Sequence, residues 1–89
     1  EQGPLGDAPV IAAPTKQAPP MTDEERSTLN AGIALLNEKQ YDQAIAKYRT
    51  VLAANPDSAG AMYEIALALT QKGDYASAIE MALKSATYD

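Results

Sequence analysis

The stretch GIALLNEKQYDQAI at residues 32–45 is followed 34 residues later by ALALTQKGDYASAI at residues 66–79. The two stretches carry a tyrosine, an alanine and an isoleucine at the same offsets, which are Tyr41, Ala44 and Ile45 and then Tyr75, Ala78 and Ile79. A near-repeat of this period is typical of arrays in which each unit buries one face against its neighbour. The sequence therefore predicts two stacked copies of one structural unit.

Each copy is predicted to be a pair of helices. Thr22 and Glu25 form a capping-box pattern at the start of the first helix. The apolar residues that follow recur at helical spacing, and no run alternates with a period of two, so no strands are expected. The first helix is expected to end near residues 39–40, and the second to run over about 41–54. The third is expected to begin at a cap on Asp57 or Ser58 and to end at a C-cap at Gly73, and the fourth to span about 75–88.

Small residues are expected where the helices cross. Gly32 with Ala44, and Ala66 with Ala78, would let two helix axes approach closely. Glycine inside a helix costs roughly 0.5–1 kcal/mol relative to alanine, so Gly32 needs a steric reason. Close packing of the second helix on the first supplies one.

The first 21 residues differ in composition from the rest. Five of the six prolines lie within the first 20 residues, and proline interrupts both helices and inner strands. Residues 1–21 are therefore predicted to be a disordered, extended Pro/Ala-rich tail or linker, and residues 22–89 to be the folded domain.

Composition excludes several classes of function. The net charge is −5 and the chain has no cysteine and no histidine, which argues against binding nucleic acid, a thiolate metal site and nucleophilic catalysis. The carboxylates fall mostly at caps, turns and outer helix faces, where solvation and helix dipoles account for them. We therefore expect no enzyme activity, no cofactor, no metal and no membrane insertion.

In its two repeated units the chain resembles the tetratricopeptide repeat family. The first unit, residues 25–58, matches through Asn30, Gly32, Leu35, Tyr41, Asp42, Ala44, Ile45, Tyr48, Leu52 and Pro56. The second, residues 59–89, matches through Tyr63, Ala66, Leu69, Gly73, Asp74, Tyr75, Ala78, Ile79, Glu80 and Lys84. The resemblance implies an all-α fold of two helix-turn-helix repeats, with four antiparallel helices.

The chain departs from the family pattern at three positions. Thr28 and Met62 stand where the family has a bulky aromatic, and Ala82 replaces the aromatic that Tyr48 supplies in the first unit. Looser packing is therefore expected in the second unit. Tyr41, Tyr48 and Tyr75 are interpreted as packing within their helix pairs.

The resemblance also implies a partner-binding groove lined by the first helix of each unit. Carried over by spacing, its residues are Leu29, Ile33, Leu36, Asn37, Tyr63, Leu67, Thr70 and Gln71. The groove is apolar and lacks the basic and amide side chains with which some members clamp a carboxylate. It suits an amphipathic helix or an extended apolar segment, with Tyr63 as the first candidate for contact. The alternative is that these residues complete a small core or contact the tail.

The last helix suggests a second surface. The chain stops where the repeat period would place its next proline, so it is expected to end at a repeat boundary. Either the parent protein continues or this surface pairs with a second copy. Its predicted residues are Ala68, Ile79 and Ala86.

The leading hypothesis is a non-catalytic protein–protein interaction module that binds a peptide or a helix. The alternatives are a structural piece that forms homo-oligomers through its last helix, and a helical appendage to an enzyme elsewhere.

Overall fold

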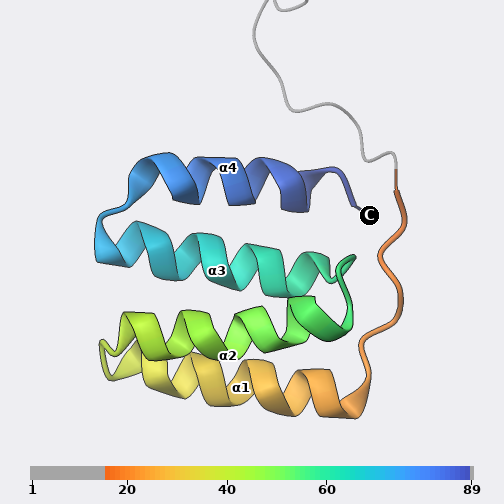
Figure 1. Cartoon of the computed structure of the whole chain (residues 1–89), viewed down its shortest axis with the longest axis horizontal. Coiled ribbons are helices and arrows are strands. Elements are labelled where there is room, and N and C mark those ends of the chain that lie inside the picture. Colours follow the sequence, from red (N-terminus) through yellow and green to blue (C-terminus); the bar gives the residue numbers. More distant parts are fainter. Residues whose placement is uncertain (1–15, 89) are drawn as a thin grey trace, which may run out of the picture.

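The computed structural model describes residues 16–88, which form four helices stacked side by side (Figure 1). They are α1 (Asp23–Asn37), α2 (Tyr41–Ala54), α3 (Ala59–Lys72) and α4 (Tyr75–Ala86). The described part holds no strand, and its only β contact is an isolated bridge between Lys16 and Tyr88. The predicted all-α fold is confirmed, although α1 and α4 each end about two residues earlier than expected.

The helix starts follow the predicted cap chemistry. The backbone N–H of Glu25 donates to Oγ1 of Thr22 at 3.1 Å, and the Thr22 N–H donates to the Glu25 carboxylate at 3.3 Å. This reciprocal pair satisfies two N–H groups that the helix itself leaves free. Of the two candidates for the cap of α3, Ser58 is the one used, because its Oγ accepts from the N–H of Ala61 at 3.2 Å.

The two hairpins, α1–α2 and α3–α4, turn at residues that lie 34 positions apart. Lys39 has φ 64° and Gly73 has φ 97°, so both occupy the left-handed region. In each turn the next N–H reaches back to the helix, from Gln40 to the Leu35 carbonyl and from Asp74 to the Leu69 carbonyl, both at 2.9 Å. Glycine adopts this conformation without strain, whereas lysine carries a Cβ that crowds the following carbonyl.

We predict that Lys39→Gly raises the free energy of unfolding by roughly 1 kcal/mol, because the left-handed conformation costs a side chain about that much. Urea unfolding followed by circular dichroism measures the change. The matched variant Gly73→Lys should lower the stability by a similar amount. Equal effects of the two variants in the same direction would contradict this interpretation of the turns.

The helices pack around a tyrosine ring that lies against Gly32. The four small residues predicted at the crossings, Gly32, Ala44, Ala66 and Ala78, are all buried. A Cβ built on Gly32 would lie 2.9 Å from Cδ1 and Cζ of Tyr48 and closer still to Cε1. The absent side chain of Gly32 is therefore the space that the ring of Tyr48 fills. Tyr48 and Ile65 are the largest fully buried side chains, and they join α2 and α3 in one core.

We predict that Gly32→Ala destabilises the domain by about 1–3 kcal/mol, because the new methyl group overpacks the Tyr48 ring. Gly60→Ala is the matched control. Its Cβ would lie 3.1 Å from Cε at the flexible end of Met21 and in ordinary contact with Leu29 Cδ1 at 3.8 Å, so the helix preference for alanine over glycine should dominate. Thermal unfolding should then move in opposite directions for the two variants, and a stabilising Gly32→Ala would show that the ring can shift at no cost.

Residues 16–21 are extended, as expected, but they contact the helices. The N–H of Lys16 donates to the Thr87 carbonyl at 2.9 Å, and the Lys16 ammonium lies 5.5 Å from the centre of the Tyr88 ring. From there the segment runs past the helix ends to the start of α1 (Figure 1). The rest of the predicted tail, residues 1–15, lies outside the described residues.

Candidate functional site

The structure removes two of the predicted groove residues from the surface. Leu29 and Leu36 are 5% and 7% exposed and belong to the hydrophobic core with Ile65 of α3. Their assignment to an open groove was wrong because α3 packs over the first hairpin and covers them. Ile33 is half-buried at the edge of this core, and Asn37 is exposed at the end of α1.

The predicted groove residues of the second hairpin remain accessible. Tyr63 is 54% exposed and Leu67 is 36% exposed, and Thr70 and Gln71 also lie at the surface. All four are on α3. Tyr63 and Leu67 are apolar or aromatic side chains facing solvent, which is the arrangement that marks a contact surface when other apolar residues adjoin it.

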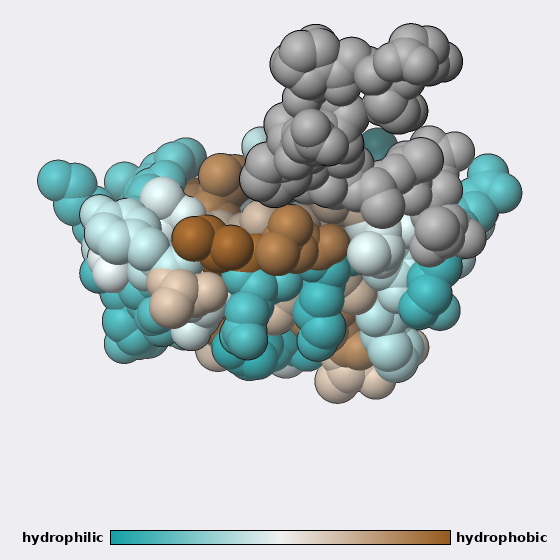
Figure 2. Space-filling model, turned by 90° about the horizontal axis from the view of Figure 1, so that it is seen from above, coloured by the Kyte–Doolittle hydropathy of each residue, from teal (hydrophilic) through white to brown (hydrophobic). Residues whose placement is uncertain are grey.

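Apolar residues of α4 do adjoin them and complete a groove. Its volume is about 330 Å³, and its lining is almost entirely apolar. We call it the α3/α4 groove, and its residues are Tyr63, Ala66, Leu67, Thr70, Tyr75, Ala78, Ile79 and Ala82. The view onto α4 in Figure 2 shows apolar residues gathered in a band on this side of the molecule. Among residues 16–88, Met21 and Leu83 are the only exposed large apolar side chains outside the groove lining.

Every residue of this groove has a counterpart 34 positions earlier in the chain. The counterparts are Leu29, Gly32, Ile33, Leu36, Tyr41, Ala44, Ile45 and Tyr48, and all of them are buried or half-buried. Ile45 is 8% exposed whereas Ile79 is 60% exposed. The first set is covered because α3 lies on it, and among the described residues no helix lies on the second.

The face of α3 that covers the first hairpin is built from small and large residues in one row. Ala61, Ile65 and Ala68 have no exposed surface, and their spacing of four and then three residues places them on one side of the helix. Lys72 continues the row, and its Nζ lies 2.6 Å from Oδ1 of Asp42 at the start of α2. Through this row α3 packs on the apolar face of the first hairpin.

That row corrects the predicted self-association surface. Ala68 faces the first hairpin and is fully buried, so it cannot contribute to an exposed surface. Ile79 does face solvent, and Ala86 is half-buried. The interpretation of Tyr75 as an internal packing residue was also wrong, since Tyr75 is 63% exposed. Its counterpart Tyr41 is half-buried at the edge of the core that includes α3.

Sequence reasoning missed Tyr75, Ala78 and Ala82 on the α4 side of the groove, and it assigned Ile79 to the self-association surface instead. The 34-residue offset contains the signal that could have found them. Once the core face of the first unit is identified, the same positions in the second unit must be either covered by a further helix or exposed.

A polar pair lies inside the first hairpin's interface with α3. The hydroxyl of Tyr48 is buried and has no hydrogen-bond partner among the described residues. Burial, with a smaller effect from the Glu64 carboxylate, raises the pKa of Tyr48 to about 12. Burial also raises the pKa of Glu64. Both groups therefore favour their neutral forms in the folded state more than in the unfolded chain.

The buried Tyr48 hydroxyl makes the free energy of unfolding depend on pH in the alkaline range. Tyr48 keeps its full contribution below the unfolded pKa of about 10, and the contribution is lost as the pH rises towards about 12. We predict that Tyr48→Phe changes the unfolding free energy by less than about 1 kcal/mol at pH 7, because no hydrogen bond is lost. Its stability should fall less than that of the wild type between pH 9 and pH 11.

Urea unfolding at several pH values measures that difference, and Tyr75→Phe, at an exposed position, is the control that should follow the wild type. Parallel curves for the wild type and Tyr48→Phe would contradict a buried, un-ionised tyrosine.

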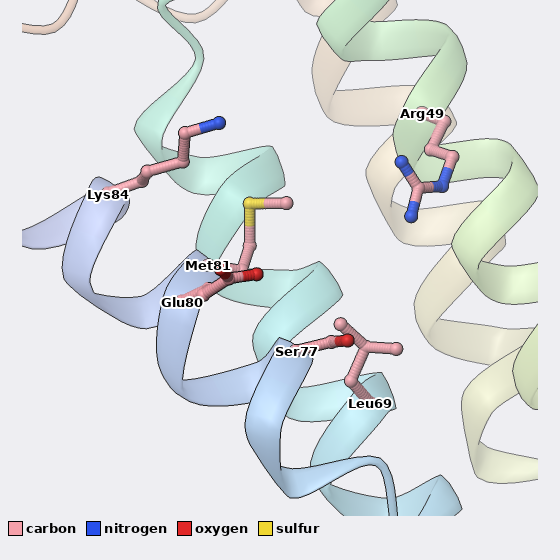
Figure 3. A pocket seen from close by; sticks show the side chains of 6 residues that line it. All are labelled: Arg49, Leu69, Ser77, Glu80, Met81 and Lys84. Atoms are coloured by element: carbon pink, nitrogen blue, oxygen red, sulfur yellow. The ribbon is translucent and has the colours of Figure 1, made fainter.

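A second cavity, of about 380 Å³, lies on another side of α4 and reaches α2 (Figure 3). Arg49 projects from α2, while Glu80, Met81 and Lys84 come from α4, with Leu69 of α3 between the two helices. Charges of both signs line the opening. This mixture does not select one class of ligand, in contrast to the uniform lining of the α3/α4 groove.

The described residues offer no other chemical centre. They contain no group of three or more acidic side chains close enough to hold a metal ion. None of the four helices has the length and apolarity that crossing a membrane requires.

Comparison with known proteins gives one match, to the family described as "Tetratricopeptide repeat", over residues 29–88. This span includes most of α1 and all of α2, α3 and α4. No curated protein and no solved structure matches the chain significantly.

Proposed function

The chain belongs to the tetratricopeptide repeat family, whose repeats generally serve as protein–protein interaction modules, and we propose that its α3/α4 groove binds an amphipathic helix of another polypeptide. Recognition of this kind places the apolar face of a helix in a hydrophobic groove. The family match is shared by proteins with many partners, so the proposal depends on what is particular to this groove.

The observation that carries the proposal is the difference in cover between equivalent residues. Leu29 and Ile45 are 5% and 8% exposed beneath α3, whereas their counterparts Tyr63 and Ile79 are 54% and 60% exposed. The protein thus contains an occupied form and an open form of the same apolar face. The occupied form holds a helix, which supports a helix as the occupant of the open form.

Neighbouring residues add to this support. Leu83 is 50% exposed one turn beyond Ile79 on α4 and lengthens the apolar row. A helical partner could therefore run along α4 for several turns, as α3 runs along α2. Aromatic side chains such as Tyr63 and Tyr75 are frequent sources of binding energy at interfaces.

The alternative occupant is a second copy of the chain. The exposed row formed by Ile79 and Leu83 could pair with itself across a two-fold axis, as interfaces between identical subunits do. In that case the domain would be a structural piece of an assembly and the groove would be closed by self-association.

A labelled peptide with the sequence of residues 57–72, the segment that contains α3, is a suitable probe because this helix already covers the equivalent face. We predict that it binds the wild type and that Ile79→Glu weakens binding by about 30-fold, or about 2 kcal/mol, because the new carboxylate would be desolvated against apolar residues. Fluorescence anisotropy measures the affinity.

Ala76→Glu is the matched control, since it adds the same charge to an exposed position of α4 outside the groove lining. It should leave the affinity within about threefold of the wild type by the usual range for surface changes. Absence of binding, or equal losses in both variants, would contradict the proposal. A dimer in sedimentation experiments that Ile79→Glu dissociates would identify the second copy as the occupant.

A further inference from the structure

The α3/α4 groove carries a smaller side chain than its occupied counterpart at one position. In the first hairpin the ring of Tyr48 fills the space over Gly32 and has no exposed surface. At the equivalent position of the second hairpin the chain has Ala82, which lines the groove beside Ala66 and Ala78. The second hairpin therefore lacks the ring that fills the first one.

The position of the missing ring along a docked helix follows from the register of α3 on α2. These two consecutive helices run antiparallel, and the ion pair between Lys72 and Asp42 fixes a common level. Tyr48 lies six residues after Asp42, and Ile65 lies seven residues before Lys72. At a rise of 1.5 Å per residue these offsets are about 9 Å and about 10.5 Å, so Ile65 lies level with Tyr48.

We infer that the α3/α4 groove selects a partner helix that carries a bulky apolar residue, preferably aromatic, at the position equivalent to Ile65. In the first hairpin and the helix that covers it, Tyr48 and Ile65 lie at the same level and are both fully buried in one core. With Ala82 in place of the tyrosine, the partner must supply the volume that the second hairpin does not. An aliphatic residue of the size of Ile65 would leave a void, and voids cost binding contacts.

The groove lining does not require a polar group on the partner side chain at the position equivalent to Ile65. Thr70 is the only non-aromatic hydroxyl residue in the groove lining, and its Oγ1 already donates to the Ala66 carbonyl at 2.8 Å. Tyr63 and Tyr75 bring two rings to the groove, and aromatic side chains pack favourably against one another. This favours phenylalanine or tryptophan over a polar residue at the selected position.

The inference rests on the proposed function, and a size-exchange experiment tests it separately. Two further probes derive from the peptide of residues 57–72, one with Ile65→Trp and one with Ile65→Ala. On the wild-type protein the tryptophan peptide should bind at least tenfold more tightly than the unmodified peptide, and the alanine peptide most weakly.

The double variant Ala66→Gly/Ala82→Tyr introduces the glycine and the ring of the first hairpin into the second and should reverse the preference. The unmodified peptide should then bind more tightly than the tryptophan peptide, because the added ring would occupy the space that the larger side chain needs. Circular dichroism melting checks that the variant is folded, and Ala82→Leu, a smaller filling, serves as a second variant with an intermediate expected preference.

The outcomes separate the two proposals. Binding that Ile79→Glu abolishes but that does not depend on the size of the residue at position 65 overturns the inference and leaves the proposed function standing. If none of the three peptides binds, the proposed function fails.

A second copy as the occupant would also overturn the inference, and it would appear as a dimer that excludes all three peptides.

Discussion

The packing of the Tyr48 ring against Gly32 is the contact on which the rest of the structure depends. It brings α2 close to α1, and it leaves a face on which Ile65 and its small neighbours can seat α3. Interiors of proteins tolerate little change in volume, so one ring and one missing side chain define the shape of this hairpin. The same constraint explains why Gly32 is kept in a helix despite its conformational cost.

The second hairpin shows what happens when part of that contact is absent. Ala66 and Ala78 keep the helix crossing close, while Ala82 removes the ring and opens the groove. The two hairpins thus present different surfaces, one covered by α3 and one exposed among the described residues. In a stacked array each unit contacts only its neighbours, so a local change of this kind alters binding without altering the rest of the fold.

Much of the fold could be predicted from the sequence because its determinants are local. The capping box at Thr22, the cap at Ser58 and the C-cap at Gly73 each fix a helix end within a few residues, and the 34-residue offset fixes how the pairs stack. The binding surface could be predicted only in part. Leu29 and Tyr63 occupy equivalent positions, yet one is buried and the other exposed, because exposure depends on whether another helix lies above. The burial of the Tyr48 hydroxyl and the contact of Lys16 with Thr87 also depend on segments that are distant in the sequence.

The contact between Lys16 and the end of α4 has a consequence for cooperativity. A linear stack of helices can lose its last member without disturbing the first, because energy is exchanged only between neighbours. Here the segment that leads into α1 is hydrogen-bonded to Thr87, and Tyr88 donates a further hydrogen bond to Asp57 at 2.8 Å. Detachment of α4 would therefore release the lead-in to α1 as well. The hydrogen bond between Lys16 and Thr87 links the segment before α1 to the end of α4, so local unfolding at either end of the domain should destabilise the other.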